Sequence, residues 1–366
     1  MSKRGRVLVA MSGGIDSSVA AVMLHEQGYE VVGLTMKTWD YVSSGGKNNK
    51  KETGCCSLES INDARSIAVN LGFPHLILDI REEFGDSVID YFVEEYIAGR
   101  TPNPCVMCNT HIKWDALLKR ADKLNCEFIA TGHYAKVRNE NDRMVISRGK
   151  DLRKDQSYVL WGISQEALKR TIFPMGQFHK AEIREMALQM GFHNLVKKPE
   201  SYEICFIPDN DYRSFLGRRV NGLTEKVANG DFVLSNGTIV GKHNGYPFYT
   251  IGQRKGLVAM GTPYYVTKIE PETNRVYIGP ADELFGSRMR VRKLNMIKYP
   301  SLEKDLETYT KIRYNDVGTP ATISQINSNQ MEVIFHEEVR SITPGQAAVF
   351  YEGEDVLGGG WIEKQL

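Results

Sequence analysis

The sequence has 366 residues, of which 42% are hydrophobic and 25% charged, and 46 basic and 45 acidic residues give a net charge of +1. This composition is typical of a globular protein of two or three domains, and it excludes a fibrous or disordered chain. The near-neutral charge argues against a protein that coats nucleic acid non-specifically, although a local basic face remains compatible with it. The apolar run before Ser12 is too short for a signal peptide and no run is long enough to span a bilayer, so we expect a cytoplasmic protein without membrane association.

The first part of the chain alternates between short apolar runs and amphipathic stretches. Strands are expected at 6–11, 30–36, 75–79 and 127–131, and helices at 16–27, 57–71, 82–98 and 109–124. Strands separated by helices of this length predict βαβ units, and therefore a doubly wound parallel sheet. Residues 41–54 are polar and rich in Gly, Lys and Asn, which predicts a surface loop.

The character of the chain changes in its second half. A hairpin is expected at 136–147, and helices at 165–170, 180–190 and 211–217. From Thr224 onward, short alternating runs at 264–269, 275–279 and 331–336 are separated by Gly, Pro and Asn, which predicts small β domains. We therefore expect an α/β catalytic domain over 1–207, a β-rich central domain over 208–283 and a C-terminal β-barrel over 284–366.

Residues 9–18, VAMSGGIDSS, join the first expected strand to the first expected helix. Two glycines permit a tight turn, and the helix N-terminus offers free N–H groups and a positive dipole end to a phosphate. Ser12 and Ser17 add hydroxyl donors, and Asp16 can hold Mg²⁺ beside the phosphates. A simpler interpretation is that the glycines only form the turn and Asp16 caps the helix. The whole string favours a nucleotide site, and it resembles the loop of the N-type ATP pyrophosphatases, which adenylate a carbonyl oxygen while splitting ATP into AMP and pyrophosphate.

Six cysteines in a cytoplasmic chain are candidates for metal binding or sulfur chemistry. Cys105 and Cys108 form the string NPCVMCN, which we expect in a loop just before a helix, where the thiol pKa of Cys108 would be lowered. Cys205 follows 205 − 108 = 97 residues later, so only folding can bring it to Cys108 as a partner thiol. A four-ligand zinc site is disfavoured because Cys55-Cys56 lacks the usual spacing, and Cys126 is expected in the core.

Ten strings in the same order carry a resemblance to one family over essentially the full chain: AMSGGIDSSVAA, GLTMKTWD, CCSLESINDAR, GRTPNPCVMCN, IKWDALL, ATGHYAK, KDQSYVL, ESYEICFI, YTIGQRKGL and SITPGQAAVFY. They are similar to those of the bacterial tRNA-specific 2-thiouridylases. The resemblance implies an ATP- and Mg²⁺-dependent enzyme that replaces the 2-oxygen of the wobble uridine with sulfur in tRNAs for Lys, Glu and Gln. It also implies a persulfide donor, such as a cysteine desulfurase or a sulfur relay protein, and a monomer.

Carried over residue by residue, the resemblance implies three sets of site residues. ATP would contact Ala10, Met11, Ser12, Gly13, Gly14, Ile15, Asp16, Ser17, Met36 and Gly132. The RNA would contact Asn103, Pro104 and Cys105 at the target base, and His133, Lys154, Asp155, Gln156, Arg313, Tyr314 and Gln346 elsewhere. Cys205 would carry the persulfide, and Cys108 would release its sulfur through a disulfide with Cys205.

One position departs from the family pattern, because most members read Asn-Pro-Asp-x-x-Cys where this chain has Cys105. This cysteine can serve as a thiol acid or base in place of the aspartate, and we count it among the catalytic residues. Alternatively, Cys105, Cys108 and Cys205 would provide three thiolates for a [4Fe–4S] cluster with one open iron that binds sulfide. Two rival functions are an amidating synthetase of the argininosuccinate or GMP type, which needs no cysteine pair, and an RNA-binding module without catalysis, against which the intact loop argues.

Overall fold

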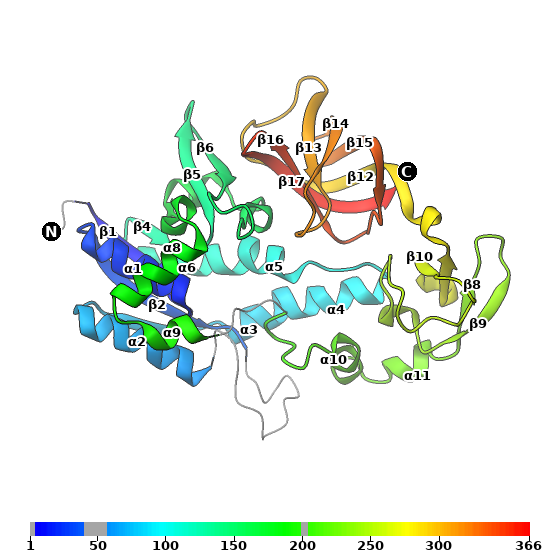
Figure 1. Ribbon diagram of the computed structural model, residues 1–366, viewed down its shortest axis with the longest axis horizontal. Coiled ribbons are helices and arrows are strands. Elements are labelled where there is room, and N and C mark those ends of the chain that lie inside the picture. The colour runs from blue at the N-terminus through cyan, green and yellow to red at the C-terminus, as the bar shows by residue number, and fades with distance from the viewer. Residues whose placement is uncertain (1–3, 40–56, 199–203) are drawn as a thin grey trace. The chain divides into compact units, whose positions relative to one another are not determined.

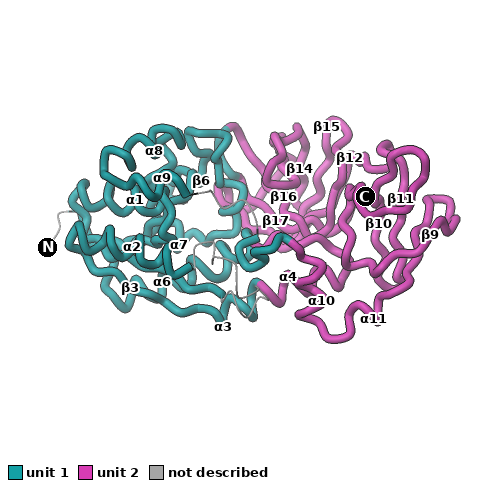
Figure 2. The backbone as a smooth tube through the Cα atoms, turned by 60° about the horizontal axis from the view of Figure 1, so that its bottom comes forward, with its two compact units in different colours: residues 1–88, 105–210, 354–356 teal, residues 89–104, 211–353, 357–366 magenta. Residues whose placement is uncertain are grey.

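The computed structural model describes residues 4–39, 57–198 and 204–366. The chain forms two compact units, coloured separately in Figure 2: unit 1 contains residues 1–88, 105–210 and 354–356, and unit 2 contains residues 89–104, 211–353 and 357–366. Each unit is thus assembled from segments that are distant in the sequence. The loop expected at 41–54 and the pair Cys55-Cys56 lie outside the described residues. The expected division into three domains stays a prediction.

Unit 1 is organised around a five-stranded parallel sheet in the order β3-β2-β1-β4-β7, of which Figure 1 labels β1, β2 and β4. Its strands are β1 (Arg6–Ala10), β2 (Glu30–Lys37), β3 (His75–Asp79), β4 (Phe128–Ala130) and β7 (Thr171–Ile172). β1 pairs with β2 on one side and with β4 on the other, so Val7 lies opposite both Val31 and Phe128. The strand order reverses beside β1, and in such sheets ligands bind outside the carboxyl ends of the strands at this point.

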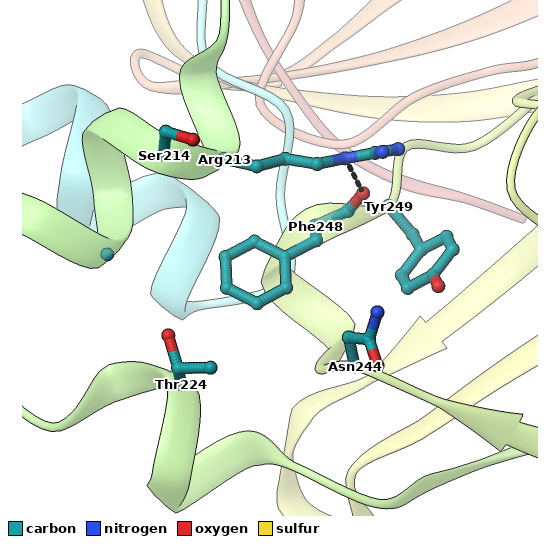
Figure 3. Close-up of a pocket in the computed structure, with 7 residues that line it drawn as sticks. Arg213, Ser214, Thr224, Asn244, Phe248 and Tyr249 are labelled. Atoms are coloured by element: carbon teal, nitrogen blue, oxygen red, sulfur yellow. Dashed lines mark hydrogen bonds between the residues drawn. The ribbon is translucent and has the colours of Figure 1, made fainter.

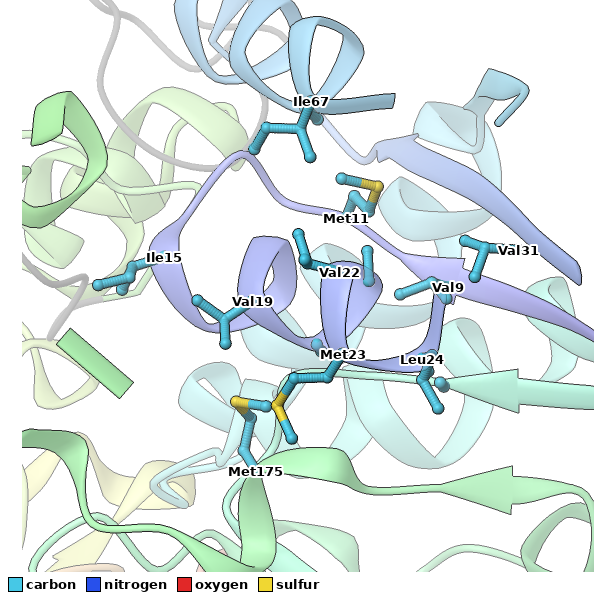
Figure 4. Close-up of a cluster of buried hydrophobic side chains, with 14 of the residues drawn as sticks. Val9, Met11, Ile15, Val19, Val22, Met23, Leu24, Val31, Ile67 and Met175 are labelled. Atoms are coloured by element: carbon cyan, nitrogen blue, oxygen red, sulfur yellow. The ribbon is translucent and has the colours of Figure 1, made fainter. Parts of the chain in front are cut away.

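Helices pack against this sheet, as the alternating pattern predicted. Those that contact its strands include α1 (Ile15–Glu26), α2 (Leu58–Leu71) and α6 (Trp114–Lys123). Unit 1 also contains α7 (Gln165–Lys169), α8 (Lys180–Gln189), which packs on α1, and α9 (His193–Lys197), which packs on α8. α1 contacts β1, β2 and α8, and Figure 4 shows Val19, Met23 and Leu24 of α1 within the apolar core. A fully buried Val or Leu stabilises a fold by roughly 1.5–3 kcal/mol, so this packing fixes the start of α1 directly after β1.

Two long helical segments contain π-helical turns. The helix expected at 82–98 consists of α3 (Arg81–Phe84), η1 (Gly85–Ile89, π) and α4 (Asp90–Ile97), and the other consists of α5 (Pro104–Met107), η2 (Cys108–Lys113, π) and α6. The expectation that Cys105 and Cys108 precede a helix is therefore wrong. The helical segment already begins at Pro104, whose fixed φ and missing N–H suit the first position of a helix. Cys108 instead opens the π-helical turn, a feature that is often found at functional sites.

A hairpin and 3-10 helices also belong to unit 1. β5 (Ala135–Glu140) and β6 (Arg143–Arg148) are antiparallel around Asn141 and Asp142, whose φ angles are +50° and +62°. Two successive residues with positive φ match the turn type that suits a two-residue hairpin. The 3-10 helices are η3 (Ser157–Leu160) and η4 (Pro174–Gln177).

Unit 2 contains a small sheet and a closed barrel. The sheet has the order β10-β11-β8-β9, formed by β8 (Gly230–Val233), β9 (Ile239–His243), β10 (Tyr265–Glu270) and β11 (Arg275–Gly279). The barrel has the order β12-β15-β14-β13-β16-β17, formed by β12 (Phe285–Met296), β13 (Leu306–Lys311), β14 (Thr319–Asn327), β15 (Gln330–Arg340), β16 (Ala347–Glu352) and β17 (Asp355–Gln365). Antiparallel pairing of β12 with β17 closes it.

The other elements of unit 2 connect these strands. They are α10 (Tyr212–Arg219), α11 (Leu223–Val227), η5 (Tyr246–Phe248), η6 (Pro271–Thr273) and η7 (Ala281–Leu284). The predicted fold class is confirmed: a doubly wound parallel sheet is followed by a small β-rich part and a C-terminal β-barrel. Among the helices that the structure describes, none combines the length and apolarity that crossing a membrane requires.

Candidate active site

The loop between β1 and α1 is held in shape by its own hydroxyl groups. The Ser12 backbone N–H donates to Ser17 Oγ at 3.0 Å, and Ser17 Oγ donates to the Gly14 carbonyl at 3.2 Å. Gly13 has a φ of +69°, and a Cβ at this position would lie 2.0 Å from the Ser60 carbonyl oxygen, so the turn requires glycine. Gly14 is the N-cap of α1 and no side chain caps this helix, which leaves its first N–H groups to bind an anion.

Asp16 takes part in a largely buried ion pair. Both of its carboxylate oxygens accept hydrogen bonds from Lys180 Nζ, at 2.6 and 2.7 Å, and Tyr134 Oη donates to Oδ1 at 2.7 Å. The Lys180 side chain is 10% exposed and that of Asp16 31%. Asp16 therefore neither caps α1 nor offers an unoccupied carboxylate.

The ion pair between Asp16 and Lys180 determines whether these residues can bind Mg²⁺. A carboxylate is the donor that Mg²⁺ prefers, but the described part of the chain does not group three metal-ligating carboxylates, histidines or cysteines anywhere. With the Asp16 oxygens already engaged by Lys180, these residues do not form a magnesium site as they stand. The role of Asp16 toward Mg²⁺ stays a prediction.

The structure brings the expected ATP-binding residues together at the carboxyl ends of three adjacent strands. Residues 10–17 begin at the last residue of β1, Met36 lies near the end of β2, and Gly132 follows β4. A Cβ at Gly132 would lie 2.8 Å from the Ser17 backbone nitrogen, so the segment after β4 packs directly against the start of α1. The binding of ATP by these residues stays a prediction.

The three cysteines predicted to be catalytic lie in unit 1, and packing connects two of their segments. Cys108 is buried and Cys205 is exposed, and both are in the thiol form. The ring of Phe206, next to Cys205, packs edge-on against Phe84 of α3 with 5.8 Å between ring centroids. α3 also contacts the π-helical turn that begins at Cys108. The segments that carry Cys108 and Cys205 therefore lie against the same short helix, although 97 residues (205 − 108) separate them.

Cys105 differs in its electrostatic environment. Its side chain retains accessible surface, yet protein atoms surround the sulfur closely enough to raise the pKa of the thiol, and the charge of Lys113 offsets only part of this effect. A raised pKa keeps the group protonated at neutral pH, so Cys105 can donate a proton more readily than it can act as a thiolate. In the described residues no metal-binding group contains Cys105, Cys108 and Cys205, so as arranged they do not form a cluster site.

His133 lies between the loop and the cysteine-bearing helix. Its Nδ1 is 2.8 Å from Thr131 Oγ1, and its ring packs against Trp114 and Phe173. Burial, together with the charge of Lys113, lowers its pKa to about 3, so the ring is neutral at physiological pH. The Lys113 ammonium thus influences both His133 and Cys105, which links the segment after β4 to the segment with the cysteines.

Two of the residues expected to contact RNA use their side chains inside the protein. Asp155 accepts hydrogen bonds from Gly149 and from both the N–H and the hydroxyl of Ser157. Gln156 Oε1 accepts from the Tyr134 N–H at 3.0 Å, next to His133. Both side chains therefore support the segment beside the loop, and a contact of Lys154, Asp155 or Gln156 with RNA stays a prediction.

Five of the residues expected to contact RNA lie in unit 2: Asn103, Pro104, Arg313, Tyr314 and Gln346. Gln346 Nε2 donates to the carbonyls of Thr101 and Pro102 at 3.1 and 3.0 Å. Gln346 therefore tethers the chain just before Asn103. Arg313 and Tyr314 are exposed on the barrel.

The described part of unit 2 includes two surface pockets. One, of about 430 Å³, includes both Arg313 and Gln346 in its lining. The other, of about 290 Å³, lies beside α10 and is bordered by Arg213, whose Nε donates to the Phe248 carbonyl at 3.0 Å (Figure 3).

Sequence reasoning missed Lys180, Tyr134 and Lys113. Lys180 and Tyr134 lie 164 and 118 residues from Asp16, so no local spacing could associate them with it. The only available signal was the position of Lys180 at the start of an expected helix, and that pattern is also common for a surface residue.

Known families and proteins match the whole chain. Residues 5–209 match the family described as tRNA methyl transferase HUP domain, residues 214–280 match its PRC-barrel domain, and residues 287–362 match the aminomethyltransferase beta-barrel domain. The chain is 68% identical to the tRNA-specific 2-thiouridylase MnmA of Amoebophilus asiaticus, over 99% of this chain and 96% of that protein. It is 66% identical to the protein of the same name from Cytophaga hutchinsonii, over 100% and 99%.

Similarity to solved structures is weak. A 4-thiouridine synthetase in complex with RNA and ATP shares 19% identity and a TM-score of 0.35, over 60% of this chain and 51% of that one. An NMN synthetase from Francisella tularensis shares 16% identity and a TM-score of 0.32, over 56% and 67%. At these scores neither likeness carries an argument about activity.

Proposed function

We propose a reaction for this chain on one premise: it belongs to the family of tRNA-specific 2-thiouridylases, and it is therefore an enzyme that transfers sulfur to tRNA. The substrate is the wobble uridine in the anticodon loops of tRNAs for Lys, Glu and Gln. ATP activates the 2-oxygen of this base, and a persulfide on Cys205 supplies the sulfur. The persulfide comes from a donor such as a cysteine desulfurase or a sulfur relay protein, and the enzyme acts as a monomer.

In the first step, the uridine 2-oxygen attacks the α-phosphorus of ATP. The bond between this phosphorus and the bridging oxygen of pyrophosphate breaks, and pyrophosphate leaves. The turn at Gly13 and the uncapped start of α1 present N–H groups to the phosphates as charge moves onto the leaving group. Adenylation converts a poorly reactive carbonyl into a carbon with AMP as its leaving group.

In the second step, the terminal sulfur of the Cys205 persulfide attacks C2 with loss of its proton, and the 2-oxygen leaves with AMP. The Cys108 thiolate then attacks the Cys205 sulfur of the resulting adduct. This releases 2-thiouridine and leaves a Cys108–Cys205 disulfide, which an external thiol reduces before the next turnover. Cys105, whose pKa is raised, is protonated and can donate to the base during these steps.

The observation that carries the proposal is the connection of the thiol segments to the nucleotide loop. Gly132 packs against Ser17, His133 follows it, and the charge of Lys113 reaches both His133 and Cys105. α3 contacts the turn that begins at Cys108 and packs against Phe206 beside Cys205. This supports an adenylating loop and two thiols that serve one uridine.

Replacing individual cysteines tests the proposal. We expect Cys205→Ser and Cys108→Ser to abolish 2-thiouridine formation, measured by mass spectrometry of tRNA nucleosides, while tRNA affinity stays within about twofold. Cys126→Ala is the matched control, because this buried cysteine lies just before β4, is not among the predicted site residues and packs as a small apolar group. Thiolation by Cys205→Ser at the wild-type rate, or equal loss of tRNA binding, would contradict the assigned role.

A further inference from the structure

The larger pocket of unit 2 gathers polar groups that the sequence did not associate. Its volume is about 430 Å³, and its polar lining includes two arginines and four hydroxyl-bearing residues: Arg313, Arg340, Thr101, Thr250, Ser341 and Thr343. Arg340 is the last residue of β15, Ser341 and Thr343 follow it, and Arg313 follows β13. Among these six residues, only Arg313 was predicted to contact RNA.

The two arginines carry positive charge that no nearby carboxylate balances. In the described part of the chain neither Arg313 nor Arg340 forms a salt bridge, and both side chains are exposed. Arg313 Nη1 donates to the backbone carbonyl of Arg340 at 3.4 Å, and the Arg340 guanidinium lies 4.8 Å from the centroid of the Tyr265 ring. Two cations that share one pocket repel each other, and an anion between them would relieve this repulsion. The planar guanidinium, with five N–H donors, matches the oxygens of a phosphate.

The wall that carries the hydroxyl groups is closely fixed. Ser341 has a φ of +61°, which is unfavourable for a residue with a side chain, and its N–H donates to the Leu284 carbonyl at 2.8 Å. Thr343 Oγ1 donates to the Ser341 carbonyl at 2.9 Å. A Cβ at Gly252 would lie 2.7 Å from Ser341 Oγ, so the two backbone segments approach closely on this side of the pocket. This wall therefore presents the Ser341 hydroxyl with little conformational freedom to lose when a ligand binds.

Another part of the pocket lining belongs to the chain segment that leads to the cysteines. Thr101 lines the pocket, and Gln346, which also lines it, donates to the carbonyls of Thr101 and Pro102. Thr101 precedes Cys105 by 105 − 101 = 4 residues. A ligand in this pocket would therefore contact the segment that ends in the predicted base-contacting residues Asn103 and Pro104.

We infer that this pocket binds a backbone phosphate of the RNA substrate, and that Arg340 is a further RNA-binding residue that acts with Arg313. The inference rests on the proposed function, because it takes tRNA as the ligand. An RNA phosphodiester fits better than a small free anion, because the pocket is open and much larger than one phosphate group. Binding there would also hold the Thr101–Pro102 segment in place through Gln346.

Salt-dependent tRNA binding tests this inference. Each lost phosphate contact reduces the slope of log affinity against log salt by about 1. We therefore expect Arg340→Ala to weaken binding about tenfold at roughly 100 mM KCl and to reduce the slope by about 1. Arg340→Lys keeps the charge but loses the planar fork, so it should show an intermediate loss. Arg288→Ala is the matched control, because Arg288 is an exposed barrel arginine that is already paired with Glu332, and it should leave the slope unchanged.

The outcomes separate the inference from the proposed function. Wild-type affinity and slope in both Arg340→Ala and Arg340→Lys would overturn the inference while leaving thiolation intact. A wild-type protein that binds no tRNA would overturn the proposed function and the inference with it. At constant ionic strength, about 20 mM inorganic phosphate should weaken tRNA binding by the wild type more than binding by Arg340→Ala, and an equal effect on both proteins would contradict a phosphate contact at Arg340.

Discussion

The ion pair between Asp16 and Lys180 is predicted to couple the nucleotide loop to α8. Lys180 Nζ donates to both oxygens of Asp16 at 2.6 and 2.7 Å, so each residue can be replaced by a neutral side chain of similar shape. Asp16→Asn removes the counter-charge of a lysine side chain that is 10% exposed. Lys180→Met keeps the apolar stem and removes the cation.

The magnitude follows from the burial of the pair. Removing one partner of a fully buried ion pair costs about 3–5 kcal/mol. The Asp16 side chain is 31% exposed, so part of its charge is solvated, and the cost of Asp16→Asn should fall to roughly 2–3 kcal/mol. Lys180→Met leaves the carboxylate with the Tyr134 hydroxyl and partial access to water, and should cost roughly 1–2 kcal/mol. The double variant contains no unbalanced charge, so we expect a coupling energy of about 1–2 kcal/mol.

Urea denaturation of the four proteins measures this coupling. Trp39, Trp114 and Trp161 all lie in unit 1, so tryptophan fluorescence mainly follows the unit that contains the pair. The three variants should shift the midpoint without a change in the m-value. The reasoning would be refuted if the loss of stability in the double variant equalled the sum of the two single losses within about 0.5 kcal/mol, because the two residues would then be energetically independent.

Three further predictions concern the loop, the histidine and the metal. Gly132→Ala should weaken ATP binding at least about tenfold in a fluorescence titration, because its Cβ would lie 2.8 Å from the Ser17 nitrogen and displace the start of α1; an unchanged ATP affinity would contradict this. The pKa of His133 is about 3 in the folded protein and near 6.5 when unfolded, so its contribution to stability is present above about pH 6.5 and lost on acidification. Between pH 7 and 5 this loss should reach about 2 kcal/mol and be absent in His133→Gln, and equal pH dependence of the two proteins would refute it. Protein purified without oxygen should be fully active without iron or labile sulfide, whereas activity proportional to iron content would favour the cluster.

Much of the fold could be predicted because its signals are local. β3 has the bounds expected from the sequence, and α2 begins directly after Ser57, whose hydroxyl accepts from the Ser60 N–H. The Ser-Gly-Gly string identified the turn after β1, since the positive φ of Gly13 is a property of that residue type. Periodicity and turn residues act over a few positions, which is the range that a single sequence reveals.

The candidate site was harder to predict from the sequence because its contacts join residues that are distant along the chain. Asp16 meets a lysine 164 residues away, and Gln346 Nε2 binds a carbonyl 245 residues away. The residues of the π-helical turn that begins at Cys108 are of types that also occur in α-helices, so the position of this turn could not be predicted. The side chain of Gln156 was expected to contact RNA, but its Oε1 accepts a hydrogen bond from the Tyr134 N–H. This partner depends on the folded position of the backbone, which the sequence alone does not give.

The most direct test of the proposed reaction follows the oxygen that sulfur replaces. A tRNA that carries oxygen-18 at the 2-position of the wobble uridine would be incubated with ATP and a persulfide donor, and the AMP would be analysed by mass spectrometry. Adenylation of the 2-oxygen predicts that each AMP formed together with 2-thiouridine contains one oxygen-18 atom in its phosphate. Unlabelled AMP, with the heavy oxygen recovered in water, would contradict the central claim.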